Sequence, residues 1–234
     1  MNKLLTLPLM HGTLINAAAV LAGSILGLLL HRKFPEKIRE IAFQGIGLFT
    51  IFLGVSMALK GTQYLFIVIS LLLGGIFGEL LKLEERMNQF GEWLKLKLKS
   101  NNSKFTEGLI TAFLLFCMGS MTILGAFEEG AGHPPNLLLA KSVMDGFSSL
   151  ALAASLGVGV LFSVIPLLIY QGGLTVFAVS LQNVLSKAII LELTSVGGIL
   201  LIGLGINILE IKKIKSLNLL PSFAVMLFLM VAFG

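Results

Sequence analysis

GFSSLALAASLGVGVLFSVIPLLIYQGGLTVFAVSLQNVLS, residues 146–186, contains no Asp, Glu, Lys or Arg. One transmembrane helix needs about 20 apolar residues, so this run is too long for a single helix and must fold back on itself. The expected bend runs from Gly157 to Pro166 and divides the region into spans over about 138–160 and 164–185. The stretch therefore predicts two neighbouring membrane-spanning helices.

The rest of the chain has the same apolar character. Hydrophobic residues make up 56% of its 234 residues and charged residues only 12%, whereas a soluble domain carries about 25% charged residues. Backbone groups in lipid must be hydrogen-bonded internally, and runs of this length favour helices over barrel strands. We expect one all-α polytopic membrane domain over residues 1–234. Six further spans are expected at 12–30, 41–59, 63–81, 108–127, 193–209 and 217–233. With the two spans described above, the chain would cross the membrane about eight times.

This composition argues against several classes of protein. A single cysteine, Cys117, excludes an internal disulfide. The three histidines, His11, His31 and His133, show no metal-ligand spacing, and no nucleophile or phosphate-loop motif is present. The net charge of +5 is explained by basic residues beside membrane segments. We therefore expect no enzymatic activity, no metal or other cofactor and no nucleic-acid partner.

Basic residues indicate the orientation. If the spans alternate, only Lys3, Lys60, Lys141 and Lys187 of the 17 Lys and Arg residues fall on one side. The positive-inside rule places the side with the other basic residues in the cytoplasm, so both termini are expected outside. The lipid bilayer is the expected partner, and a homo-oligomer is an alternative that the sequence leaves open.

Residues 82–104 form the longest polar stretch. Leu83, Met87, Phe90 and Leu94 recur at helical spacing, with charges on the other face. This pattern predicts an amphipathic helix on the cytoplasmic surface, anchored in the membrane interface. A regulatory or partner-binding role is the alternative.

Two predicted spans resemble each other across an offset of 151 residues. Residues 47–56 align with 198–207 and are identical at Gly47, Ile51, Leu53 and Gly54. The first of these spans ends outside and the second inside, so the relation would be an inverted repeat of spans one to three and six to eight. Many secondary transporters contain inverted repeats. Shared Gly and Leu composition is the alternative explanation.

Asp145 is the strongest candidate for a functional residue. An ionisable residue inside the bilayer costs about 2.5–3.5 kcal/mol on insertion scales, so it needs a reason to be there. Lys141 lies four residues earlier, on the same face of a helix. The two residues either bind a cation or proton together or form a structural ion pair.

Other polar residues also fall in or near predicted spans. Glu128 and Glu129, between Gly125 and Gly130, are expected in an unwound turn at the outer mouth of span four, where carboxylates attract cations. Glu192 is expected at the outer interface. Asn16 lies one turn into span one.

Tyr170 and Gln171 precede Gly172 and Gly173 inside span six. This sequence predicts a broken helix whose free carbonyl groups line a binding site. A bent helix in which Gln171 bonds to a neighbouring helix is the alternative.

Several short motifs in order resemble a known family. They are Gly12-Thr13-Leu14-Ile15-Asn16, Gly125-Ala126-Phe127-Glu128-Glu129-Gly130, Ala140-Lys141-Ser142-Val143-Met144-Asp145, Ala154-Ser155-Leu156-Gly157, Ile165-Pro166, Val196-Gly197-Gly198 and Leu219-Leu220-Pro221. Their order and spacing resemble the YqgA/YdfK family of bacterial inner-membrane proteins, a domain of unknown function. The resemblance implies a bacterial plasma-membrane protein with a suggested role in transport, and it supplies no functional residues.

The leading hypothesis from the sequence is a secondary transporter or ion-coupled carrier of a small ion or polar metabolite. Spans four to six would line its site, and Asp145 would bind the cation or proton. The alternatives are a non-transporting scaffold or regulatory protein and a passive channel. A channel requires a continuous polar face, which no span shows.

Overall fold

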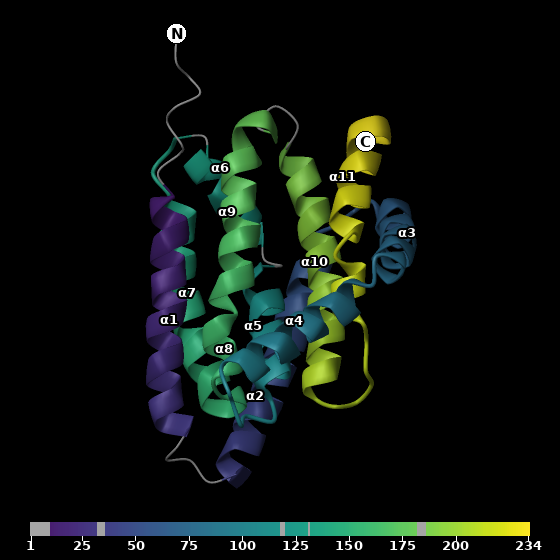
Figure 1. Cartoon of the computed structure of the whole chain (residues 1–234). Coiled ribbons are helices and arrows are strands. Elements are labelled where there is room, and N and C mark those ends of the chain that lie inside the picture. The colour runs from purple at the N-terminus through teal and green to yellow at the C-terminus, as the bar shows by residue number, and fades with distance from the viewer. Residues whose placement is uncertain (1–9, 32–35, 118–119, 131, 182–185) are drawn as a thin grey trace.

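The computed structural model describes residues 10–31, 36–117, 120–130, 132–181 and 186–234, and all regular structure in these ranges is helical (Figure 1). The predicted end of span six at 182–185, and the basic residues Lys3, Arg32 and Lys33, lie outside the described residues. The helices are α1 (His11–His31), α2 (Glu36–Ala58), α3 (Tyr64–Leu80), α4 (Leu83–Lys97), α5 (Phe105–Cys117), α6 (Ser120–Gly130), α7 (Asn136–Leu156), α8 (Gly159–Phe162), α9 (Val164–Leu181), α10 (Lys187–Ile208), the 3-10 turn η1 (Ser216–Leu219) and α11 (Ser222–Phe233).

Their length and composition fit a polytopic membrane protein. Five helical segments in the described residues are long and apolar enough to cross a membrane: α1, α7, α8 with α9, α10, and η1 with α11. Two bent pairs, α3 with α4 and α5 with α6, raise that number to seven if each pair is one span. The apolar part of α2, Gln44–Ala58, is shorter. The prediction of eight spans therefore depends on how these three segments sit in lipid.

The fold-back inside 146–186 lies where the sequence indicates it. Helix α7 ends at Leu156. Gly157 follows with a φ of +83°, a backbone conformation that residues other than glycine rarely adopt. The Asn102 side chain donates to the Leu156 carbonyl oxygen at 2.8 Å, which satisfies one orphan group at the end of α7. Pro166 lies near the start of α9, where its missing N–H costs no helical hydrogen bond.

The break within a span is in a different place from the one predicted. Span four was expected to be one helix, but α5 and α6 meet at 64° across residues 118–119, which the structure does not describe. For span six the predicted broken helix is wrong, because α9 runs as one helix through Gly172 and Gly173. The hydrogen bonds of the alternative are present, since Gln171 bonds to Asn16 and Thr13 of the neighbouring helix α1. The carbonyl oxygen of Gln171 accepts from the Thr175 hydroxyl at 3.1 Å while the helix continues, so it does not line a gap.

The polar stretch 82–104 contains the predicted helix. Helix α4 turns 50° away from α3 after Lys82, which has a φ of +52°. Gly91 and Leu94 are buried against the bundle, whereas Trp93 and Leu96 are exposed. Exposed aromatic and aliphatic residues beside lysines suit the boundary between lipid and water.

Glycines bring α1 and α7 into close contact. The two helices run in the same direction, with Gly12 against Leu138, Gly23 against Gly146 and Gly27 against Leu150. A β-carbon on Gly23 would come 2.0 Å from the Gly146 carbonyl oxygen, so only glycine fits there. This approach positions the two helices that carry Asn16 and Asp145.

Helices α2 and α10 pack in opposite directions with a reciprocal pattern of contacts. Gly54 lies against Gly198, and Gly205 lies against Gly47. Adding 151 to Gly54 and Gly47 gives Gly205 and Gly198, so the offset seen in the sequence exchanges the two contacts. The same offset relates the bounds of α1 to α9 and of α3 to η1 with α11 to within a few residues. These features are what an inverted repeat requires, and superposition of the two halves remains a prediction.

The centre of the bundle is formed by α5 and α10. Phe116 and Leu114 of α5, and Leu200 and Leu204 of α10, are at most 2% exposed. Large apolar side chains such as Phe52, Leu65 and Leu72, on α2 and α3, are instead more than half exposed. So much apolar surface on the outside of a helical bundle is expected for a protein whose solvent is lipid.

Topology can be tested at the connection between α10 and η1. In Figure 1, α1 begins and α11 ends at the upper end of the molecule, and the connection that leaves the end of α10 lies at the lower end. Green fluorescent protein fused after Lys215 should fluoresce because we expect that end to be cytoplasmic. Alkaline phosphatase fused at the same point should be inactive, and phosphatase activity there would reverse the predicted orientation.

Candidate functional site

Lys141 and Asp145 form an ion pair inside the bundle. They lie one turn apart on α7, with 4% and 7% of their surfaces exposed. The Lys141 ammonium also lies 5.9 Å from the centre of the Phe116 ring on α5. Burying both charges is costly, and their mutual attraction compensates because the geometry is close and hydrogen-bonded.

Asn16 of α1 connects this pair to α9. Its side-chain nitrogen donates to Asp145 Oδ2 at 3.1 Å and to Gln171 Oε1 at 3.1 Å. Both Asn16 and Gln171 are fully buried. Helices α1, α7 and α9 therefore meet through three polar side chains.

A second carboxylate completes the arrangement. Gln171 donates to the Thr13 hydroxyl at 3.2 Å, and that hydroxyl donates to Glu129 Oε2 at 2.7 Å. The Thr175 hydroxyl lies 3.3 Å from the same Glu129 oxygen. These bonds join helices α1, α6, α7 and α9. We refer to the connected side chains as the polar network: Thr13, Asn16, Glu129, Lys141, Asp145, Gln171 and Thr175.

The side chain of Glu129, on α6, reaches the N-terminal end of α1. The backbone N–H groups of Gly12 and Thr13 both donate to its carboxylate. The first N–H groups of a helix have no partner within it and carry the positive end of the helix dipole, so they stabilise a carboxylate. The polar network therefore contains two acidic groups, one balanced by Lys141 and the other by a helix terminus.

One acceptor in the polar network lacks a partner. Asn16 Oδ1 is buried and has no hydrogen bond within the described part of the chain. An unsatisfied buried polar atom costs about 1–3 kcal/mol. The position beside it suits a donor such as a water molecule, an ammonium group or a hydroxyl group.

The structure brings together four of the six residues singled out from the sequence: Asp145, Lys141, Gln171 and Asn16. Glu128 is not part of the polar network, since it accepts from the backbone N–H of Leu137 at 3.0 Å near the start of α7. Tyr170 is half-buried and packs edge-on against Phe113, with 6.3 Å between ring centres. The predicted unwound turn at residues 125–130 is wrong, because α6 remains helical to Gly130.

Glu192 lies near the start of α10, and its expected place at the outer interface stays a prediction. It is 3% exposed, and it accepts from the backbone N–H groups of Thr62 and Gln63 at 2.8 and 3.2 Å. Its second oxygen has no partner among the described residues. Glu192 therefore stabilises the start of α3, as Glu129 does for α1.

Sequence reasoning missed Thr13 and Thr175. Each lies one helical turn from a residue that was selected: Thr13 precedes Asn16 by three positions and Thr175 follows Gln171 by four. Such spacing places them on the same faces, so a search for polar partners at these positions would have found them.

The described residues contain no group of three or more His, Cys, Asp or Glu side chains that could hold a metal ion. The polar network instead offers two carboxylates, two amides, two hydroxyls and one ammonium. Such groups can hold a proton, a monovalent cation or a small polar solute.

Comparison with known proteins places the chain in a family. The family model described as "Protein of unknown function (DUF554)" matches residues 11–231. The chain belongs to the DUF554 family. It is 36% identical over 232 residues to the "Uncharacterized membrane protein YdfK" of Bacillus subtilis (strain 168), covering 96% of this chain and 99% of that protein.

A second relative comes from another bacterium. The chain is 33% identical over 216 residues to the "Uncharacterized protein YqgA" of Escherichia coli (strain K12), covering 90% of this chain and 92% of that protein. No solved structure matches this DUF554 protein. The family identifies a membrane protein without giving a function.

Proposed function

We propose that this DUF554 protein is a secondary transporter whose polar network binds a coupling cation or proton together with a small ion or polar metabolite. The observation that carries the proposal is the buried Lys141–Asp145 pair, linked through Asn16 and Gln171 to two further helices. Apolar side chains would fill this space without the cost of burying charge. Ionisable groups kept inside a membrane domain are typical of ion and substrate pathways.

The position of the polar network supports the same function. Asn16 comes from α1 and Gln171 from α9, which correspond at the 151-residue offset and run in opposite directions. In carriers built from inverted repeats, the substrate and ion sites lie where the two repeats meet. The bend between α5 and α6 adds an interrupted helix next to the site, which is also common in carriers.

The described conformation is closed around the polar network. Its residues are at most 7% exposed. We interpret this as an occluded state, from which movement of one repeat against the other would open the site to either side. A passive channel would need a continuous polar path, and the closed packing gives that alternative less support.

The proposal extends to location and partners. We infer that the protein lies in the lipid bilayer of a bacterial plasma membrane, with both termini outside. It would move a solute across the bilayer and would have no catalytic activity. A scaffold or regulatory role would rest on the exposed face of α4, which includes Trp93 and Leu96. In that alternative the buried polar network would serve only to hold the helices together.

Ligand-dependent thermal unfolding tests the proposed site. The purified protein should show a higher Tm with at least one solute from a panel of inorganic ions, amino acids and organic acids. Gln171→Leu should abolish that shift because it removes the link between Asn16 and Thr13. The control Gln63→Leu changes an exposed side chain and should keep the shift. A shift that survives in Gln171→Leu, or no shift with any solute, would argue against a binding site in the polar network.

A further inference from the structure

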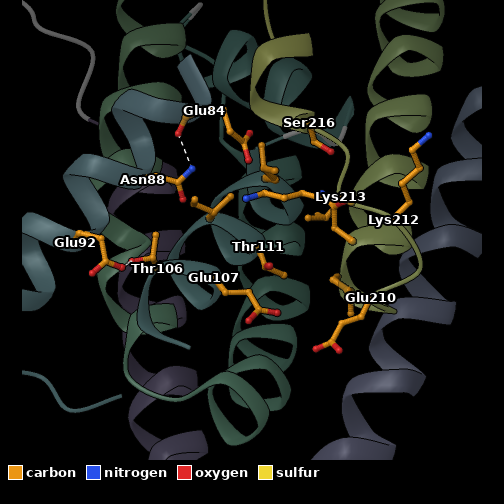
Figure 2. A pocket seen from close by; sticks show the side chains of 15 residues that line it. Glu84, Asn88, Glu92, Thr106, Glu107, Thr111, Glu210, Lys212, Lys213 and Ser216 are labelled. Atoms are coloured by element: carbon orange, nitrogen blue, oxygen red, sulfur yellow. Dashed lines mark hydrogen bonds between the residues drawn. The ribbon is translucent and has the colours of Figure 1, made fainter. Parts of the chain in front are cut away.

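A second polar region lies away from the polar network, at the end of the bundle where α10 finishes. It is a cavity of about 480 Å³ between α4, α5, α10 and the connection to η1 (Figure 2). Ligand pockets are commonly about 300–1,000 Å³. The cavity and the polar network share no residue, so this site is independent of the proposed function.

One wall of the cavity is apolar. It is formed by Ile110 and Leu114 of α5 and by Leu204 and Ile208 of α10. An apolar wall beside a few polar groups is typical of sites for small organic molecules. A bare metal ion is a poor fit, since the described residues contain no cluster of metal-binding side chains.

Four carboxylates line the cavity, and two of them already have partners. Glu84 accepts from the backbone N–H of Leu217 at 3.3 Å. Glu92 accepts from the Thr106 hydroxyl at 2.6 Å. Glu107 and Glu210 form no hydrogen bond or close ion pair within the described ranges. They are the carboxylates available to a ligand.

Glu107 and Glu210 lie at the same end of the cavity. In Figure 2 their labelled side chains are drawn near each other, and the Glu210 charge disfavours the charge of Glu107, though less strongly than the Lys104 charge favours it. Lys104 attracts Glu107 from outside the lining. Lys212 points away from the other labelled side chains. The positive charge of Lys213 favours the charge of Glu84 at the opposite end of the cavity. This end of the cavity therefore attracts positive charge.

The backbone at Glu210 is unfavourable for glutamate. Glu210 follows the last turn of α10 with a φ of +56°, where glycine is the usual residue. A negative charge at a helix C-terminus is also disfavoured by the helix dipole. Glu210 therefore does not stabilise the fold at this position.

A buried hydroxyl in the lining lacks a partner. Ser216 is 1% exposed, and its oxygen has no hydrogen bond in the described part of the chain. The orphaned hydroxyl, the two carboxylates and the apolar wall are separate features of one cavity.

We propose that this cavity binds a small organic amine. Its ammonium group lies between the Glu107 and Glu210 carboxylates, and its carbon chain packs against Ile110 and Leu204. Binding offsets the repulsion between the two carboxylates and gives both of them a partner. The two carboxylates without partners select a positively charged group, and the apolar wall beside them selects a carbon chain.

Three molecules of the same carbon skeleton test this proposal on the purified full-length protein: n-butylamine, butyrate and 1-butanol. Butylamine should raise the Tm by several degrees and bind measurably by calorimetry, whereas butyrate and butanol should do neither. Glu107→Gln and Glu210→Gln should each weaken butylamine binding at least tenfold. The matched control Glu85→Gln removes an exposed charge of α4 outside the cavity and should bind as the wild type does.

Glu210→Gly keeps the test decisive if another variant folds poorly. It should raise the Tm of the ligand-free protein, because glycine suits the left-handed backbone, while it weakens butylamine binding. Equal effects of butylamine and butanol would overturn the proposal. Unchanged butylamine binding in Glu107→Gln, Glu210→Gln and Glu210→Gly would also overturn it.

Discussion

Asp145→Asn is expected to lower the free energy of unfolding by about 3–5 kcal/mol, the usual cost of breaking a buried ion pair. The amide keeps the shape of Asp145 but leaves the Lys141 ammonium without a counter-charge, at 4% exposure. Denaturation of the purified protein in a mild detergent, followed by circular dichroism, measures this change. The control Glu85→Gln removes one partner of an exposed pair with Lys82 and should cost less than about 1 kcal/mol.

The double variant Asp145→Asn with Lys141→Met separates pairing from function. Replacing both charges by neutral groups should recover stability to within about 1 kcal/mol of the wild type, because an apolar replacement of a buried pair is often neutral. Transport should not recover, since the group proposed to bind the cation or proton is gone. If Asp145→Asn alone were as stable and as active as the wild type, Asp145 would have no role in either.

Gly23→Ala is expected to destabilise the protein by about 3 kcal/mol through overpacking. The new β-carbon would meet the Gly146 carbonyl oxygen at 2.0 Å and Ser149 Oγ at 2.2 Å. Because the nearest atoms include backbone, α1 and α7 must separate. That movement also pulls Asn16 away from Asp145, so we expect transport to fall together with stability.

Gly45→Ala is the matched control for this substitution. A β-carbon at Gly45 of α2 would have no neighbour within 4 Å. It should leave stability unchanged or raise it by up to about 1 kcal/mol, because alanine favours a helix over glycine. Equal Tm values for Gly23→Ala and the wild type would show that α1 and α7 are not in close contact.

Much of the helical organisation could be predicted because the length of an apolar run is a local property of the sequence. The bend after Leu156, the existence of helix α4 and the pairing of Lys141 with Asp145 all follow from nearby residues. The family resemblance is also confirmed.

The choice between Glu128 and Glu129 could not be made from local information. Neighbouring residues on a helix point about 100° apart, so only one of them faces α1. Which one does depends on how α6 turns after α5, and that orientation is set by tertiary packing. The structure assigns Glu129 to the polar network and Glu128 to the start of α7.

The choice between a broken and a continuous α9 could not be made from the sequence for a similar reason. Gly172 and Gly173 weaken an isolated helix, but packing around the buried Gln171 outweighs that local preference. The two threonines were missed because their roles appear only when α1, α6 and α9 are brought together.

Coupled proton movement in liposomes tests the central claim most directly. The wild type is reconstituted with the pH-sensitive dye pyranine inside, and solutes that raise its Tm are added outside in the presence or absence of a sodium gradient. We predict solute-dependent proton or sodium movement by the wild type and none by the double variant Asp145→Asn with Lys141→Met at equal stability. Solute-coupled flux that persists undiminished in the stable double variant would contradict the claim that the polar network is the coupling site.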